Sequence, residues 1–407
     1  MGSIINSLLY LACLPYYLVF FFHDFQRDSL EPMQNPRNIP IMRPLLPEAQ
    51  YILPYLETID KNRWYSNFGP LAVEFERRLE KFFDMGQGTV LTVANGTSGL
   101  SATLRALDLP KGSFCLVPSW TFMASPAAAI ASGLVPYFID IDKDSWAIEP
   151  ESVKEWIKKV PGMVSAVMVV SPFGAPLDTA KWDEFSSETG IKVLIDAAAG
   201  FDSFSTVPKA KPGKCPVMIS MHATKVFGLG EGGIIISSDA GLMQRVRELI
   251  NFGFSGAREI RLPGTNAKMS EYAAAVGLAA LDLWSHKKAV WTRLKLHYIE
   301  SFRECFGRDV SSPWLLSDEW VSSVCNVSFT GLMAKDIIAA LKGKGIEGKQ
   351  WWTRGCHNHP AYAKFLRMEL PVTEMLADTV VGLPFSIDLS RTDIDYVIEH
   401  LRNITRT

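Results

Sequence analysis

The sequence lacks an excess of charge of either sign. Its 41 lysines and arginines nearly balance its 43 aspartates and glutamates, and the formal net charge is -2. Binding of DNA or RNA is driven largely by clustered cations, and no such cluster occurs along the chain. We therefore expect no nucleic-acid partner.

Closely spaced cysteines are also missing. The six cysteines form no CxxC pair and no regular spacing, which argues against both a zinc site and a disulfide framework. His357 and His359 are near each other, but no third ligand stands at a suitable spacing, so we expect a structural or substrate-side role for them. We expect no metal, and the cysteine usage favours a reducing compartment such as the cytoplasm.

Long hydrophobic runs are confined to the N-terminus. Residues 7–22, SLLYLACLPYYLVFFF, are almost wholly apolar, and no charge precedes His23. The run lacks the cationic start of a signal peptide, contains Pro15, and is shorter than the roughly 20 residues of a spanning helix. Two interpretations of this extension, residues 1–38, stay open: an anchor for a membrane or a partner, and a segment without a targeting role.

From Ile39 onward, short apolar runs alternate with helical stretches. The predicted strands cover residues 89–93, 114–118, 136–141, 164–173, 192–198 and 232–238. Several of these runs lack polar alternation, as expected for strands buried on both faces of a mostly parallel sheet between helices. The sequence therefore predicts a large α/β domain over 39–285 and a smaller α+β domain over 286–407.

Two stretches carry groups suited to binding a ligand. In ANGTSGL (94–100), small residues between a strand and a helix would let backbone N–H groups and the hydroxyls of Thr97 and Ser98 face an anion. In VLIDAAAG (193–200), Asp196 ends a buried strand, where parallel sheets usually keep their ligand crevice. An ordinary turn or helix cap remains the alternative for each stretch.

A third stretch is SMHATKVFGLGEGG, residues 220–233. Lys225 precedes a glycine-rich turn, and a lysine becomes a nucleophile toward a carbonyl only if desolvation or a nearby cation lowers its pKa. The alternative is a surface lysine on a strand-turn-strand hairpin. Together, a phosphate cradle, a carboxylate, and a serine and lysine roughly thirty residues later are the parts needed to hold pyridoxal 5'-phosphate.

The sequence resembles the DegT/StrS family of sugar aminotransferases, which are pyridoxal phosphate enzymes of fold type I. The resemblance covers nearly everything from Ile39 to the C-terminus. The blocks that carry it, in the family's order, include RWYSNFGPL, NGTSGL, PSWTFMAS, LIDAAAG, SMHATK, GEGG, GTNAKMSEYAAAVGL, HPAY and GLPF. A match in so many blocks is far more specific than any single motif.

This resemblance implies roles for three residues around the cofactor ring. Lys225 would hold the cofactor as a Schiff base and move protons during transamination. Asp196 would be the partner of the pyridine nitrogen. Phe122 would stack on the ring, and an electron-rich aromatic face suits a cationic pyridinium.

The resemblance also implies a set of phosphate ligands and a homodimer. Thr97, Ser98 and Ser220 match phosphate ligands within the subunit. Asn266 matches a residue that reaches the phosphate from the neighbouring subunit, so two shared active sites are expected. The sequence departs from the family pattern at Ala199, where a glutamine is common.

The resemblance implies an enzyme that transfers an amino group from an amino acid to a nucleotide-linked keto sugar, with glutamate as the expected donor. One alternative is a sugar dehydratase of the same family, but those members replace the lysine with histidine, and Lys225 is present here. The other is a non-catalytic regulatory or membrane-associated member, which Ala199 and the apolar N-terminus would suit.

Overall fold

The structure is a computed structural model that describes residues 37–256, 259–260, 262–307, 310–315 and 317–405. The chain separates into two units, residues 1–37 and 38–407, and all elements below belong to the second. The predicted extension 1–38, with its apolar segment 7–22, lies outside the described residues except for Arg37 and Asn38. Within the described ranges, no helix is both long and apolar enough to span a bilayer.

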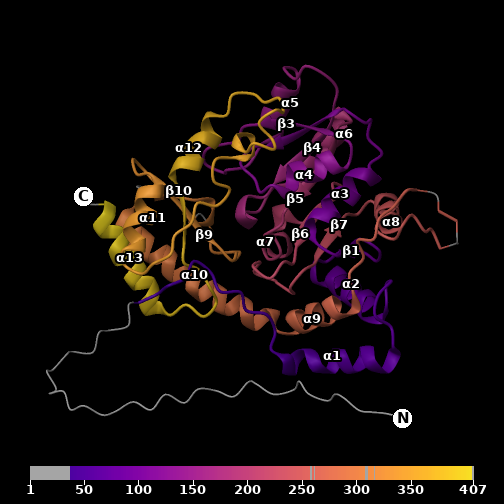
Figure 1. Cartoon of the computed structure of the whole chain (residues 1–407), viewed down its shortest axis with the longest axis horizontal. Coiled ribbons are helices and arrows are strands. Elements are labelled where there is room, and N and C mark those ends of the chain that lie inside the picture. Colours follow the sequence, from indigo (N-terminus) through magenta and orange to yellow (C-terminus); the bar gives the residue numbers. More distant parts are fainter. Residues whose placement is uncertain (1–36, 257–258, 261, 308–309, 316, 406–407) are drawn as a thin grey trace, which may run out of the picture. The chain divides into compact units, whose positions relative to one another are not determined.

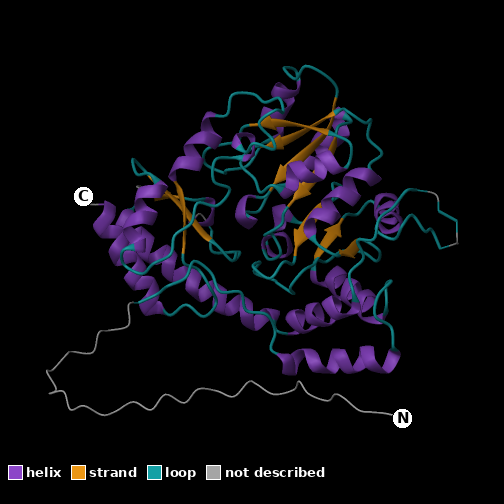
Figure 2. Cartoon of the chain, viewed as in Figure 1, coloured by secondary structure: helices purple, strands orange, loops and turns teal. Residues whose placement is uncertain are grey.

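A seven-stranded sheet forms the centre of this unit, with the strands in the order β1-β7-β6-β5-β4-β2-β3 (Figures 1 and 2). Strands β6, β5, β4, β2 and β3 pair in parallel, whereas β7 runs antiparallel to both β1 and β6. The strands are β1 (Val90–Val93), β2 (Phe114–Pro118), β3 (Val135–Ile139), β4 (Val164–Val170), β5 (Lys192–Asp196), β6 (Val217–Ser220) and β7 (Gly233–Ile236).

Both faces of the sheet are covered by helices, which explains the apolar character of the strands. Along β5, Val193 and Ile195 pack into one hydrophobic cluster and Leu194 into the other. One face packs on α3 (Gly96–Ala106), α4 (Ala124–Ala131) and α8 (Ala240–Leu249). The other packs on α2 (Pro70–Phe82), α5 (Pro150–Ile157), α6 (Thr179–Thr189) and α9 (Glu271–Asp282), and α1 (Ala49–Asn62) lies on α9.

The C-terminal part has its own small sheet. Three antiparallel strands lie in the order β10-β9-β8, and the long helix α10 packs on α13 (Figure 1). The bounds are α10 (Trp284–Phe306), β8 (Val310–Ser311), β9 (Cys325–Phe329), α11 (Ala334–Lys342), α12 (Pro371–Thr379), β10 (Val380–Leu383) and α13 (Arg391–Thr405).

A C-terminal segment returns to the large sheet. The N–H of Cys356 donates to the carbonyl of Ser119 over 2.8 Å, and the N–H of Met368 donates to the carbonyl of Phe138 over 3.1 Å. The carboxylate of Asp140, just after β3, accepts from the N–H groups of Val372 and Thr373 and so caps α12. These bonds fix the segment 356–373 against the carboxyl ends of β2 and β3.

The predicted α/β fold class with a mostly parallel sheet is confirmed, and six of its seven strands agree with the predicted runs. The sequence did not predict strand β6, because this strand is only four residues long and directly follows the turn-like stretch KPGKCP. With β6 in place, β6 and β7 form the antiparallel hairpin that encloses Lys225.

Candidate active site

The predicted site residues gather at one edge of the large sheet. Asp196 is the last residue of β5 and Ser220 is the last residue of β6. Strand β1 points the same way as β6, because both are antiparallel to β7, so the N-terminus of α3 starts at the same edge. This is where parallel sheets place their ligand crevice.

The start of α3 forms the predicted phosphate cradle. A Cβ atom added at Gly96 would lie 2.9 Å from the sulfur of Met218 and 3.3 Å from the Cβ atom of Ser220, so the backbone of the helix start lies directly against the end of β6. Thr97 is exposed there. Thr97 therefore lies at the positive end of the helix and Ser220 lies beside the helix start, and phosphate binding by these residues stays a prediction.

Ser98 lies in the same turn, but its polar groups already have partners. Its N–H donates to the Oδ1 atom of Asn95 over 2.9 Å, and its hydroxyl lies 3.0 Å from the carbonyl oxygen of Asn95. Asn95 is therefore the N-cap of α3, a residue that we did not single out in the sequence. The sequence signal for this capping role is that Asn95 directly precedes Gly96, Thr97 and Ser98, the first residues of the helix.

Asp196 is nearly buried, with 4% of its surface exposed. Burial raises the pKa of its carboxyl group, while hydrogen bonds and the positive charge of Lys225 oppose this effect. The hydroxyl of Ser125 donates to Oδ2 over 2.6 Å, and the N–H of Ala198 donates to Oδ1 over 3.2 Å. Ser125 lies in the first turn of α4, is itself buried, and lies 3.0 Å from the hydroxyl of Thr121.

Lys225 lies in the loop between β6 and β7. Hydrogen bonds from Leu229 N–H to the carbonyl of Met221 and from Met221 N–H to the carbonyl of Gly232, both 2.9 Å, close this loop. The side chain is half-buried, and desolvation lowers the pKa of its amine, although the nearby carboxylate of Asp196 partly restores it. Its Nζ atom makes no hydrogen bond or ion pair with any residue that the structure describes. The side chain is therefore less exposed than that of an ordinary surface lysine.

Phe122 and Asn266 both present exposed side chains. Phe122 connects β2 to α4, and 65% of its surface is exposed, an unusual fraction for a phenylalanine. Asn266 accepts a hydrogen bond of 2.8 Å from Lys268, whose ammonium lies 4.9 Å from the ring centre of Phe252. The carbonyl of the next residue, Ala267, accepts from the N–H of Ala94 over 2.7 Å, which ties this segment to the residues just before the start of α3.

The sequence assigns no role to Glu231 or Ala199, and the structure shows what lies next to each. The carboxylate of Glu231 lies 3.7 Å from the Nε2 atom of His222, whose Nδ1 atom lies 2.8 Å from the hydroxyl of Thr224. Ala199 is half-buried and lies close to Gly174. A Cβ atom added at Gly174 would be 2.5 Å from the carbonyl oxygen of Ala199, so only a glycine fits there. Glu231 and His222 thus lie near each other within the loop that carries Lys225.

His357 belongs to the packing of the C-terminal segment. Only 2% of its surface is exposed, and its Nδ1 atom lies 2.7 Å from the hydroxyl of Ser119. Nearby, the rings of Trp352 and Phe173 stack with their centres 4.0 Å apart, so Trp352 also packs this region. Among the described residues, no group of three or more His, Cys, Asp or Glu side chains could hold a metal ion.

The sequence profile of the DegT/DnrJ/EryC1/StrS aminotransferase family matches residues 48–402. The chain belongs to this aminotransferase family. A dTDP-4-amino-4,6-dideoxy-D-glucose transaminase of Shigella dysenteriae is 28% identical over 384 residues, which cover 91% of this chain and 100% of the relative. An Escherichia coli protein of the same name is 28% identical over 374 residues, which cover 88% of this chain and 96% of the relative.

Solved structures agree with the family. A candidate PLP-dependent aminotransferase from Bacillus cereus has a TM-score of 0.83 and 30% identity, with 90% of this chain and 100% of that chain covered. DesI, solved in the presence of its TDP-sugar product, has a TM-score of 0.79 and 30% identity, with 90% and 92% covered. The comparisons confirm the predicted family, fold type and sugar aminotransferase function, and they do not favour the dehydratase or non-catalytic alternatives.

We expect Ser125→Ala to weaken cofactor binding. The buried carboxylate of Asp196 would lose its shortest hydrogen bond, and the pKa of that carboxyl would rise further. Loss of a hydrogen bond to a charged group predicts a rise of about 10- to 100-fold in the dissociation constant of pyridoxal phosphate, measured by absorbance titration. Ser132→Ala, at the other end of α4, is the matched control and should bind normally. Equal binding by both variants would contradict the role given to Ser125.

Proposed function

We propose that this aminotransferase uses pyridoxal 5'-phosphate to move an amino group from glutamate to the keto group of a nucleotide-linked sugar. The observation that carries the proposal is the convergence of the Asp196 carboxylate and the Lys225 amine at one end of the sheet, beside an anion-binding helix start. The names of the relatives support both the reaction and the substrate class.

The residues present fit pyridoxal phosphate. A carboxylate has about four lone-pair positions, and Asp196 uses two of them in the bonds described above, so it retains capacity for a ring N–H. The start of α3 offers backbone donors for a phosphate, since Gly96 has no side chain to cover them. Phe122 offers an exposed ring face. When bound, the cofactor supplies an electron sink for the carbon that exchanges its proton.

Each site residue then has a separate task. Asp196 holds the ring nitrogen in its protonated state, and Ser125 fixes the orientation of that carboxylate. Thr97, Ser98 and Ser220 hold the phosphate, with Ser98 reaching it only if its bonds to Asn95 loosen.

Lys225 acts as both nucleophile and proton carrier. Because desolvation lowers its pKa, a larger share of its amine is neutral near neutral pH than for an ordinary lysine, and the neutral amine attacks carbonyl groups. Once the amine of the donor has displaced it, the freed Nζ atom would take a proton from the donor carbon, and in the second half of the reaction it would deliver a proton to the sugar carbon. A histidine at this position, as in the dehydratase alternative, could not form the covalent link.

The sugar is proposed from the relatives. The Shigella and Escherichia coli proteins are named for an amino group at carbon 4 of a dTDP-linked dideoxyglucose. The matching ketone, a dTDP-linked 4-keto-6-deoxyglucose, is therefore the first substrate to test. The five cysteines of the described part, Cys115, Cys215, Cys305, Cys325 and Cys356, are all unbridged, which supports the expected cytoplasmic location.

The proposed assembly is a homodimer in which the large domain, 39–285, and the small domain, 286–407, of each subunit frame one site. Support comes from the exposed side chains of Tyr65 and Tyr272, whose rings stack with their centres 6.3 Å apart and so form one exposed aromatic surface. Asn266 lies beside Phe252 through Lys268 and is exposed. It would contact the phosphate held by the partner subunit.

Lys225→Ala should abolish turnover. The variant loses both the covalent attachment point and the proton carrier, and we expect a fall of at least about 1,000-fold in the rate of sugar amination. Wild-type protein should show the visible absorption band of the lysine-bound cofactor, and borohydride should fix that cofactor on Lys225, located by mass spectrometry. Lys335→Ala, on the exposed side of α11, serves as the control. Full activity of Lys225→Ala would refute the proposed function.

A mixing experiment tests the shared site. Lys225→Ala and Asn266→Asp should each impair both sites of a homodimer, the second because a carboxylate repels the phosphate. If Asn266 acts across the subunit boundary, a mixed dimer holds one intact site, and equal mixing should restore about a quarter of the wild-type sites. If Asn266 acts within its own subunit, or the protein is an active monomer, mixing restores nothing.

A further inference from the structure

The loop between β2 and α4, residues 119–123, carries Phe122, the proposed stacking partner of the cofactor ring. The side chain of Phe122 is 65% exposed, whereas Trp120 and Thr121 directly before it are each only 1% exposed. An exposed ring gains little from packing within its own protein, so the path of the loop backbone decides where the ring lies. Whatever fixes this loop therefore also places Phe122.

A C-terminal segment, residues 351–362, holds this loop, and we call it the clamp segment. The N–H of Cys356 donates to the carbonyl of Ser119 over 2.8 Å, and the thiol of Cys356 lies 3.4 Å from the carbonyl oxygen of Thr121. The hydroxyl of Tyr362 lies 3.4 Å from the carbonyl oxygen of the last loop residue. The first, third and fifth residues of the loop thus contact the clamp segment through their carbonyl groups.

The shortest contact between the two segments joins the side chains of Ser119 and His357. The hydroxyl of Ser119 lies 2.7 Å from the Nδ1 atom of His357 and accepts from the N–H of the same residue over 3.2 Å. The Nε2 atom has no hydrogen-bond partner among the described residues, since the carboxylate of Glu374, 3.7 Å away, is beyond hydrogen-bond reach. The imidazole therefore acts on the loop through Nδ1.

The surroundings of this bond leave little room for movement. Gly355 has a positive φ of 75°, and a Cβ atom added there would lie 3.2 Å from both the Nδ1 atom of His357 and the hydroxyl oxygen of Ser119. A larger residue would strain the backbone and press on the bond. The rings of Trp120 and Trp352 also meet edge to face with their centres 5.5 Å apart, which joins the same two segments.

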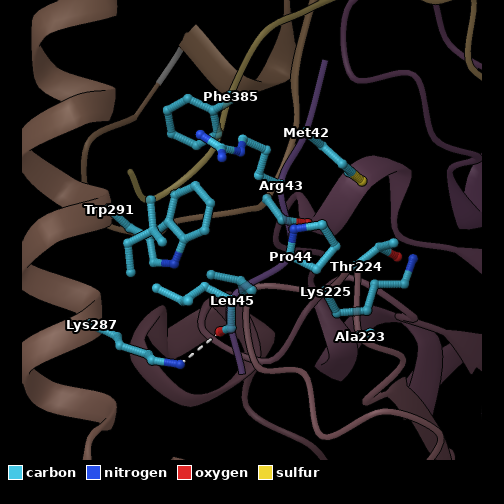
Figure 3. A pocket seen from close by; sticks show the side chains of 13 residues that line it. Met42, Arg43, Pro44, Leu45, Ala223, Thr224, Lys225, Lys287, Trp291 and Phe385 are labelled. Atoms are coloured by element: carbon cyan, nitrogen blue, oxygen red, sulfur yellow. Dashed lines mark hydrogen bonds between the residues drawn. The ribbon is translucent and has the colours of Figure 1, made fainter. Parts of the chain in front are cut away.

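The clamp segment lies apart from the pocket beside Lys225. Figure 3 shows that pocket, whose walls include Arg43, Pro44 and Phe385. Among the described residues, none from the loop 119–123 and none from the clamp segment lines it. A change in the clamp segment should therefore move Phe122 without altering the immediate surroundings of Lys225.

We propose that His357 and Ser119 are positioning residues for the cofactor ring. Their hydrogen bond fixes the loop 119–123, and the loop holds Phe122 where it stacks on the ring. The inference rests on the proposed function for the presence of the cofactor. It gives the C-terminal part of the chain a task in the reaction that the large domain does not perform alone.

Ser119→Ala tests the bond from the side of the loop. We expect the dissociation constant of pyridoxal phosphate to rise about 3- to 10-fold, the effect of losing one neutral hydrogen bond. The visible circular dichroism band of the bound cofactor should weaken, because an achiral ring gains this signal only from fixed asymmetric surroundings. Borohydride should still attach the cofactor to Lys225, since the pocket of that lysine is unchanged.

Two variants of His357 test the bond from the other side. His357→Leu should match Ser119→Ala, because both remove the same contact. His357→Asn should restore values close to wild type, since the amide of asparagine reaches the position of Nδ1 and Nε2 makes no bond that could be lost. Equal behaviour of the two His357 variants would contradict the inference.

Ser237→Ala is the matched control for a loss of stability. Ser237 is also fully buried, and its hydroxyl donates to the carbonyl of Lys214 over 2.7 Å. It follows β7, which runs antiparallel to β6, so it lies at the sheet edge away from the site. Both serine variants should lower the melting temperature, but only Ser119→Ala should change the dichroism of the cofactor.

The Phe122→Ala background decides whether the bond acts through the aromatic ring. There the added Ser119→Ala change should raise the dissociation constant of the cofactor less than about twofold, because the ring to be positioned is gone. The same rise in both backgrounds would overturn the inference, and so would wild-type binding and dichroism in Ser119→Ala and His357→Leu.

These measurements keep the inference distinguishable from the proposed function. Cofactor binding and dichroism are read before any sugar is added. If wild type binds the cofactor but aminates no sugar, the proposed function fails, yet a dichroism signal that depends on Ser119 and His357 still supports the inference. Normal sugar amination with no effect of the clamp variants on the cofactor would overturn the inference alone. A wild-type protein that binds no pyridoxal phosphate would overturn both.

Discussion

The buried carboxylate of Asp196 is the interaction on which the rest of the site depends. A carboxylate with 4% of its surface exposed is stable in its charged form only with partners, and the structure provides the Ser125 hydroxyl, the Ala198 N–H and the charge of Lys225. The same burial lowers the pKa of Lys225. One low-dielectric position at the end of β5 thus prepares both an acceptor for a ring N–H and an amine that can attack a carbonyl.

Two segments from the ends of the described chain complete this arrangement. The C-terminal segment 356–373 hydrogen-bonds to the residues after β2 and β3, next to the loop that leads to Ser125. Residues 39–45 hydrogen-bond to Gly345 and Phe385 of the C-terminal part and to Lys287 of α10. The proposed catalytic residues thus lie on the α/β core, and segments from both ends of the described chain pack around it.

Much of this could be predicted from the sequence, because the relevant signals are local. Apolar runs predict six of the seven strands, Asp196 stands at the end of one such run, and Lys225 precedes the glycine-rich turn before another. Ser125 could not be found in this way: it lies 71 positions before Asp196 in ASPAAAIA, which has the pattern of an ordinary helix. The contact between Glu231 and His222 could not be predicted either, because it depends on how the turn between β6 and β7 folds.

The protonation state of the cofactor's ring nitrogen tests the central claim most directly. It can be measured by nitrogen NMR on the enzyme loaded with isotopically labelled pyridoxal phosphate. The buried carboxylate of Asp196 predicts a protonated nitrogen in wild type at neutral pH and an unprotonated one in Asp196→Ala. An unprotonated ring in wild type, or the same signal in both proteins, would contradict the account.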